Sequence, residues 1–97
     1  MNKKFVVLVC LLVSAYANAS TVTLTWTQSD SPGIVYNKVY CGYVSGGPYL
    51  WRRKTSDPAT SLTVLNVNSG TYYCMVTAID GQGIESVASN EVKVVVP

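Results

Sequence analysis

The sequence predicts an all-β sandwich in a single domain. Its apolar residues recur with a period of two rather than 3.6, as they do along half-buried strands, and no segment has the pattern of an amphipathic helix. Clusters of turn-forming residues separate these segments at the short intervals that are typical of a sandwich. No internal repeat or linker divides residues 20–97, so we expect them to form one domain.

The N-terminal segment, residues 1–19, predicts a cleaved secretory signal peptide. A short stretch with two lysines precedes the unbroken apolar run of residues 5–13, and Ala17 and Ala19 are small residues at positions −3 and −1 from the bond before Ser20. The apolar run is much shorter than the roughly 20 residues that a membrane-spanning helix needs. We therefore expect cleavage between Ala19 and Ser20, or two residues earlier, and a secreted chain, extracellular or periplasmic, without a membrane span.

Six strands are predicted after the signal peptide. In the first, residues 21–27, Val22, Leu24 and Trp26 alternate with threonines, so the apolar side chains share one face of the strand. The other five are bounded by clusters of Gly, Pro, Asn, Asp and Ser. They are expected at residues 34–43, 49–53, 61–65, 72–79 and 87–96.

The composition excludes most mechanisms of small enzymes. The chain has no histidine, hence no imidazole base and no His-ligated metal, and no nucleophile has an identifiable base. We expect no catalytic residue, no cofactor and no metal; Asp80 and Glu85, two carboxylates in one turn, are weak evidence for a cation site. The net charge of +2 comes from the two signal-peptide lysines, since residues 20–97 hold five basic and five acidic residues. No overall field would attract nucleic acid.

Two cysteines remain once the signal peptide is removed. Cys10 leaves with the signal, and Cys41 and Cys74 stay in a chain that is expected in an oxidising compartment. An even pair of cysteines there suggests a disulfide.

The order and spacing of these segments resemble a fibronectin type III domain of the bacterial secreted kind. The resemblance covers residues 20–97 and is carried by VTLTW at 22–26, KVY at 38–40 leading into SGGPY at 45–49, GTYYCMVTAID at 70–80, ES at 85–86 and SNEV at 89–92. It implies an immunoglobulin-like β-sandwich with Trp26 in its core. It also implies that Tyr72 is the tyrosine corner, whose hydroxyl bonds to nearby backbone.

The resemblance also implies how the cysteines pair. The strands that contain Cys41 and Cys74 are antiparallel neighbours in this family, and a register that places the two cysteines opposite each other also pairs Val39 with Val76. Opposed residues on antiparallel strands are close enough for a disulfide. We therefore expect a cross-strand Cys41–Cys74 disulfide; the alternative is two buried free thiols.

One departure from the family concerns its first strand, strand A, which normally precedes Val22. Cleavage after Ala19 would leave the domain lacking this strand or with a shortened one, and residues 20–27 would form an unpaired edge without the charges or prolines that usually protect one. Such an edge could accept a strand from another chain, including a second copy. The alternatives are that a short edge is tolerated, or that residues 29–33 or the segment before Ser61 cover it.

The remaining candidate is an aromatic and basic binding surface. Tyr36, Lys38 and Tyr40 on one predicted strand, with Trp51 and Arg52 on the next, are expected to point outward. Tyr, Trp and Arg are enriched at binding hot spots, and the rings could stack on sugars. The alternative is that these side chains only cover a twisted sheet and favour its strands.

These observations together predict a secreted non-catalytic binding or adhesion module that contacts a protein or an extracellular glycan. The alternative function is that of a structural subunit that assembles by β-strand addition at the edge formed by residues 20–27.

Overall fold

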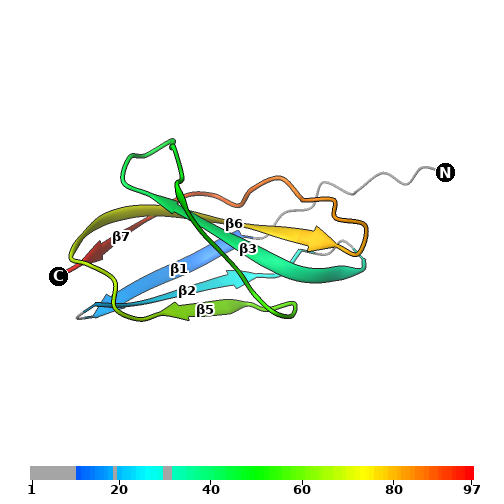
Figure 1. The fold of residues 1–97 in the computed structure, drawn as a ribbon, viewed down its shortest axis with the longest axis horizontal. Helices are drawn as coiled ribbons and strands as arrows, with labels where there is room; N and C mark the ends of the chain where they lie inside the picture. The colour runs from blue at the N-terminus through cyan, green and yellow to red at the C-terminus, as the bar shows by residue number, and fades with distance from the viewer. Residues whose placement is uncertain (1–10, 19, 30–31) are drawn as a thin grey trace.

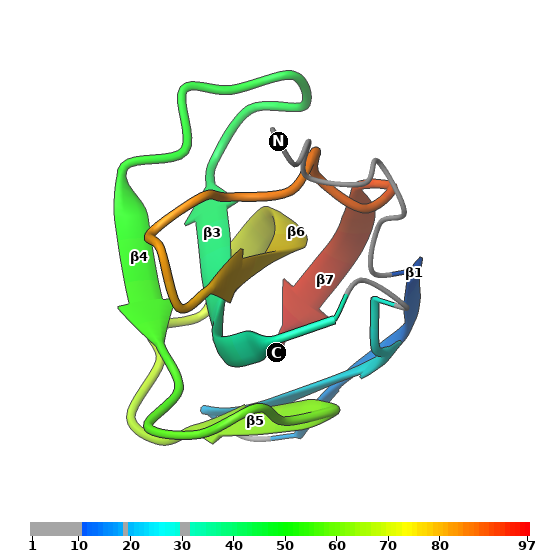
Figure 2. The ribbon, with the colours of Figure 1, turned by 90° about the vertical axis from the view of Figure 1, so that its right-hand side faces the viewer.

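The computed structural model describes residues 11–18, 20–29 and 32–97. Within them, antiparallel strands form two sheets that pack face to face, which Figure 2 shows as two layers. The three-stranded sheet has the order β1(Leu11–Asn18), β2(Thr21–Thr27), β5(Ser61–Val64). The four-stranded sheet has the order β4(Trp51–Lys54), β3(Ile34–Gly42), β6(Gly70–Asp80), β7(Val92–Val96). The predicted all-β sandwich is confirmed.

The core lies between the two sheets and follows the period of two. Leu24 and Trp26 of β2 face Val39 of β3, Val76 of β6 and Val94 of β7, and each of these five side chains is at most 2% exposed. The threonines of β2 alternate with its core residues and lie on the other face, where Thr23 Oγ1 and Thr63 Oγ1 are 3.1 Å apart. Alternating apolar and hydroxyl side chains thus fold residues 21–27 as a half-buried strand.

The predicted register between the cysteine-bearing strands is confirmed. In β3 and β6, Cys41 is opposite Cys74 and Val39 is opposite Val76. Asn37, further along β3, is fully buried. A buried amide needs hydrogen-bond partners, and the polar junction around Asn37 supplies them.

This junction joins both sheets. Asn37 Nδ2 donates to Gln28 Oε1 (2.9 Å) and to the carbonyl of Thr77 (3.1 Å), while its Oδ1 accepts from Gln28 Nε2 (2.9 Å) and from the backbone N–H of Ala59 (3.0 Å). The partners come from the end of β2, from β6 and from the segment before β5. One side chain therefore ties together elements that are far apart in the sequence.

The last strand is shorter than predicted. β7 begins at Val92 rather than at residue 87. The preceding segment still follows β6, but Ser86 Oγ and Ser89 Oγ accept the hydrogen bonds of Ala78 N and Val76 N (2.9 Å each). Because serine hydroxyls take the place of main-chain acceptors, the ladder becomes irregular there and residues 87–91 form no regular strand.

The largest difference from the sequence prediction is at the N-terminus. Leu11–Asn18, part of the predicted signal peptide, form β1 and pair with β2 from Leu11 opposite Thr27 to Asn18 opposite Thr21. Figure 1 shows β1 at the edge of the three-stranded sheet. The expectation of an absent first strand is thereby corrected for the full chain, because an extended segment of apolar and small residues can satisfy the free edge of β2. The expectation for the cleaved chain stays a prediction.

Candidate binding surface

The strands that carry the candidate residues are cross-linked. The structure forms the predicted Cys41–Cys74 disulfide between β3 and β6, with the two Cα atoms 4.1 Å apart and a sequence separation of 33 residues. Both cysteines are buried. The cross-link fixes β3 in register, and β3 in turn sets the position of β4.

Tyr72 lies at the start of β6, and its hydroxyl donates a 2.6 Å hydrogen bond to the carbonyl of Asn68. This is the contact that a tyrosine corner makes, a hydroxyl bonded to backbone a few residues upstream. The ring also packs against that of Tyr43, with the centroids 5.4 Å apart. Tyr72 thus fastens the turn between β5 and β6 and stands apart from the outer face of β3 and β4.

Four of the five predicted surface residues gather on the outer face of the four-stranded sheet. The register of β3 and β4 places Tyr40 opposite Arg52 and Lys38 opposite Lys54. The cationic groups of Lys38 and Arg52 lie 5.3 and 5.9 Å from the centroid of the Tyr40 ring, and that of Lys54 lies 5.1 Å from the centroid of the Tyr36 ring. We call this surface the basic face; it consists of Tyr36, Lys38, Tyr40, Arg52 and Lys54.

Glu85 fixes the centre of the basic face. Its Oε2 accepts hydrogen bonds from the Tyr40 hydroxyl (2.5 Å) and from Thr77 Oγ1 (2.6 Å). Partial burial of the ring, and then the hydrogen bond to Glu85, raise the pKa of Tyr40, so its hydroxyl stays protonated and keeps donating at neutral pH. The interaction with Tyr40 raises the pKa of Lys38, which therefore carries its full charge.

One carboxylate, that of Glu85, lies at the basic face, and its attraction contributes to the raised pKa of Lys38. In the part of the chain that the structure describes, however, neither Glu85 nor any other carboxylate forms an ion pair with Lys38, Arg52 or Lys54. Directly opposed like charges such as Lys38 and Lys54 destabilise a strand pair. The rings of Tyr36 and Tyr40 offset part of this cost, because a cation above an aromatic face is attracted to it.

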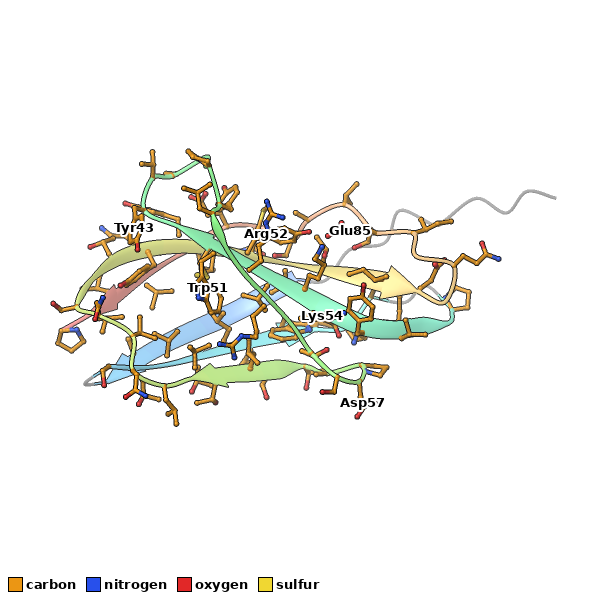
Figure 3. The ribbon with its side chains drawn as sticks, viewed as in Figure 1. Tyr43, Trp51, Arg52, Lys54, Asp57 and Glu85 are labelled. Atoms are coloured by element: carbon orange, nitrogen blue, oxygen red, sulfur yellow. A yellow bond between two sulfur atoms is a disulfide. The ribbon has the colours of Figure 1, made fainter. Side chains whose placement is uncertain are left out.

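Trp51, the fifth predicted surface residue, lies on the other side of the sheet. It is opposite the inward-facing Cys41, and Figure 3 shows it directed toward β5 while Arg52 is directed to the side of Glu85. The prediction missed this because it treated Trp51 and Arg52 as neighbours on one face, whereas adjacent strand residues point to opposite faces. The same rule would have found Lys54, two residues beyond Arg52.

Trp51 borders a cleft of about 270 Å³ between the sheets, on the side where β4 and β5 are edge strands. Tyr43, Leu65 and Arg53 also line it, and Cys41 and Cys74 lie among its lining residues. The Arg53 guanidinium is 5.4 Å from the Trp51 ring centroid. The cleft is mostly apolar and separate from the basic face.

Glu91 holds the turn before β4, a contact that no local sequence signal indicates. Its carboxylate accepts from Gly46 N (2.9 Å), from Ser45 Oγ (2.6 Å) and from the Tyr49 hydroxyl. These hydrogen bonds, that of Gly46 first, lower the pKa of Glu91 below its ordinary value of 4.5. The turn is predicted correctly from its Gly and Pro residues, but its anchor is more than 40 residues away in sequence.

Asp80 and Glu85, the two turn carboxylates considered as a cation site, accept hydrogen bonds that stabilise the fold. Asp80 Oδ1 accepts from the backbone N–H groups of Gln82 and Ile84 (2.9 Å each), while Glu85 is engaged by Tyr40 and Thr77. Among the described residues, no group of three or more His, Cys, Asp and Glu side chains could hold a metal ion. The same residues include no helix long and apolar enough to cross a membrane.

Solved structures similar to this chain share its fold. A Fn3-like protein from Clostridium thermocellum is 30% identical, with 92% of each chain covered and a TM-score of 0.76. The FN5 domain of Drosophila Lar is 18% identical over 91% of this chain and 94% of that one, with a TM-score of 0.66. The pectate lyase PelI from Erwinia chrysanthemi, in complex with tetragalacturonic acid, is 23% identical over 87% of this chain and 27% of that one, with a TM-score of 0.68. No family model and no curated protein sequence matches the chain.

The extent of the Clostridium thermocellum match bears on β1. Residues 20–97 are 78 of the 97 residues, about 80% of the chain, so a match over 92% also includes part of the segment before Ser20. The place that β1 occupies is therefore part of the shared structure.

Proposed function

The chain belongs to the fibronectin type III family, and from this premise we propose that it is a secreted, non-catalytic binding module that contacts an anionic extracellular carbohydrate through its basic face. The supporting observation is that Lys38 lies opposite Lys54 across β3 and β4 and Arg52 lies opposite Tyr40, while no carboxylate of the described residues forms an ion pair with these three cations. Cations that gather on one face although their repulsion lowers the stability of the strand pair are typical of a surface that binds a partner.

The geometry favours a partner with regularly spaced negative charges. Neighbouring strands are about 4.8 Å apart, so the cations of β3 and β4 form a compact array rather than a single point charge. The tyrosine rings limit the motion of the lysines above them, which lowers the entropy lost when an anion binds. A chain of uronic acids offers such charges and also sugar rings that can pack beside Tyr36 and Tyr40.

The choice of carbohydrate over protein also draws on the structural neighbours. Two of them are parts of pectate lyases, and one of these was solved with tetragalacturonic acid. Domains of this fold thus accompany proteins that act on an acidic polysaccharide, and tetragalacturonate is a suitable probe.

Titration of the isotope-labelled chain with tetragalacturonate, followed by NMR, tests this proposal. We expect the amide signals of β3 and β4 to shift, and the affinity to fall as salt is added, because these charges are exposed and screened. The double variant Lys38→Gln and Lys54→Gln should bind at least tenfold more weakly. Lys93→Gln, which removes an exposed charge from β7, is the matched control and should change the affinity less than twofold.

Two results would contradict the proposal. Equal binding of neutral and acidic oligosaccharides would show that the cations do not determine recognition. If the same residues bound an acidic protein and did not bind tetragalacturonate, the basic face would remain a binding surface, but a carbohydrate would not be its partner.

We also propose that residues 1–19 are a signal peptide and that the protein acts outside the cytoplasm. The buried Cys41–Cys74 disulfide supports this, because such bonds form and persist in oxidising compartments. The intact mass of the protein recovered from the medium or periplasm tests it: we expect a chain that begins at Ser20, with the bond intact. A chain that keeps residues 11–18 would refute the cleavage.

A further inference from the structure

We propose that the processed chain dimerises through β2, which pairs with β2 of a second copy once β1 is removed. The inference depends on the cleavage proposed above and is independent of the basic face. The resulting sheet would have the order β5-β2-β2-β5 across a two-fold axis.

β1 occupies the edge of β2 that a second copy would take. β1 pairs along the whole of β2 and also contacts β7 of the other sheet, while the opposite side of β2 pairs with β5. The bond between Ala19 and Ser20 lies in the connection from β1 to β2, so cleavage there separates the two strands without touching β5. Ala19 itself lies outside the described residues.

The connection between β1 and β2 is also poorly suited to a permanent hairpin. Ser20 has a φ of 73°, a left-handed conformation that costs free energy in a residue other than Gly. Tight hairpins usually place Asn-Gly or Asp-Gly at such positions. The residues before β2 match a protease site better than a turn.

The direction of the main-chain groups follows from two hydrogen bonds. Trp26 N donates to the carbonyl of Thr60 (2.8 Å), and the carbonyl of Ser20 accepts from Val67 N (2.9 Å), so the even-numbered residues point their backbone groups toward β5. Backbone groups alternate along a strand. The four threonines of residues 21–27 therefore direct their N–H and C=O groups toward β1, and cleavage leaves all of these groups without a protein partner.

A second copy of β2 satisfies these groups with good complementarity. In an antiparallel pair centred on Leu24, Thr23 is opposite Thr25 of the second copy, and each hydrogen-bonded pair consists of two threonines. The outward hydroxyls would continue the Thr23–Thr63 contact already present between β2 and β5. On the inner face, Leu24 is opposite its own symmetry mate, so the apolar row extends across the axis.

Charge also favours a second copy at this edge. Residues 21–27 contain no charged residue and no proline, the features that usually prevent strands from pairing edge to edge. The edge strand β4 carries Arg52, Arg53 and Lys54, and β7 carries Lys93, so two copies would repel each other there. β5, the other uncharged edge, has only four residues, whereas the processed chain would offer the seven residues of β2, so β2 is the longer edge at which like chains meet without repulsion.

Sedimentation of the secreted chain, with its start at Ser20 verified by mass, tests the inference. We expect a dimer whose fraction rises with concentration. Thr25→Pro removes an N–H on the β1 side and leaves the Trp26–Thr60 hydrogen bond in place, so it should weaken dimerisation at least tenfold. Thr25→Val keeps the N–H and is the matched control, which should dimerise like the unchanged chain.

Hydrogen exchange of the unchanged chain gives a second readout that does not depend on a variant. The amides of Thr23 and Thr25 should exchange fast at low concentration and slowly at high concentration. A monomer at millimolar concentration, a dimer that Thr25→Pro leaves intact, protection by a strand of a different protein, or a secreted chain that retains β1 would each overturn the proposal. Loss of tetragalacturonate binding would leave it untouched.

Discussion

Reducing the Cys41–Cys74 disulfide is predicted to lower the free energy of unfolding by about 3–4 kcal/mol. The bond closes a loop with a sequence separation of 33 residues. The chain-entropy relation for a loop of that length gives about 3.7 kcal/mol at 25 °C, because the cross-link restricts the unfolded chain. A domain of this size has a total stability of roughly 4–12 kcal/mol, so the loss is a large part of it.

Urea unfolding of the oxidised and the reduced protein, followed by the fluorescence of the buried Trp26, measures this difference. Reduction keeps the volume of the two sulfur atoms, whereas the double variant Cys41→Ala and Cys74→Ala also leaves a cavity in the core, because both side chains are buried. The variant should therefore be less stable than the reduced protein by about a further 1–2 kcal/mol. A loss below 1 kcal/mol on reduction would refute the loop-entropy reasoning.

Three further predictions concern the polar contacts. Asn37→Leu should cost about 3 kcal/mol in urea unfolding, because it removes the hydrogen bonds that the buried Asn37 side chain makes to Gln28, Thr77 and Ala59; an unchanged midpoint would contradict this. Because the pKa of Glu91 is lower in the folded than in the unfolded state, the unfolded state binds more protons than the folded state as the pH falls, and stability should decrease below about pH 5. Glu91→Gln should flatten that part of the pH profile in thermal unfolding. Tyr72→Phe, which loses the hydrogen bond to Asn68, should cost about 1 kcal/mol, and a neutral result would show that the ring alone holds the turn.

The parts of the fold that the sequence predicted correctly rest on local rules. Strict alternation in residues 21–27 determines which side chains enter the core. The register of β3 on β6 was predicted differently: the family resemblance made the two strands antiparallel neighbours, and the cysteine pair then aligned them. The start of β7 was missed because it depends on Ser86 and Ser89, whose hydroxyls replace main-chain acceptors only when β6 lies beside them. Contacts of this kind exist in the folded chain and leave no period in the sequence.

The candidate surface shows the same division. Tyr36, Lys38 and Tyr40 could be placed on one face because they alternate within one strand. Which residues of β4 join them depends on the register of β4, and that register places Arg52 and Lys54 beside them but not Trp51. Glu85 arrives from a separate loop, so its part in orienting Tyr40 could not be read from either strand.

In the N-terminal segment, a signal peptide and an edge strand require a similar amino-acid composition. A signal peptide needs an apolar run followed by small residues, and an edge strand needs an extended segment of apolar and small residues. Residues 11–18 satisfy both, because a strand ladder is formed by main-chain groups that every residue except proline supplies in full. Side-chain fit therefore contributes little to which strand can pair with β2. The free main-chain groups of its threonines and its lack of charged residues determine this. The same two properties allow β2 to pair with residues 11–18 in the full chain and with β2 of a second copy after cleavage.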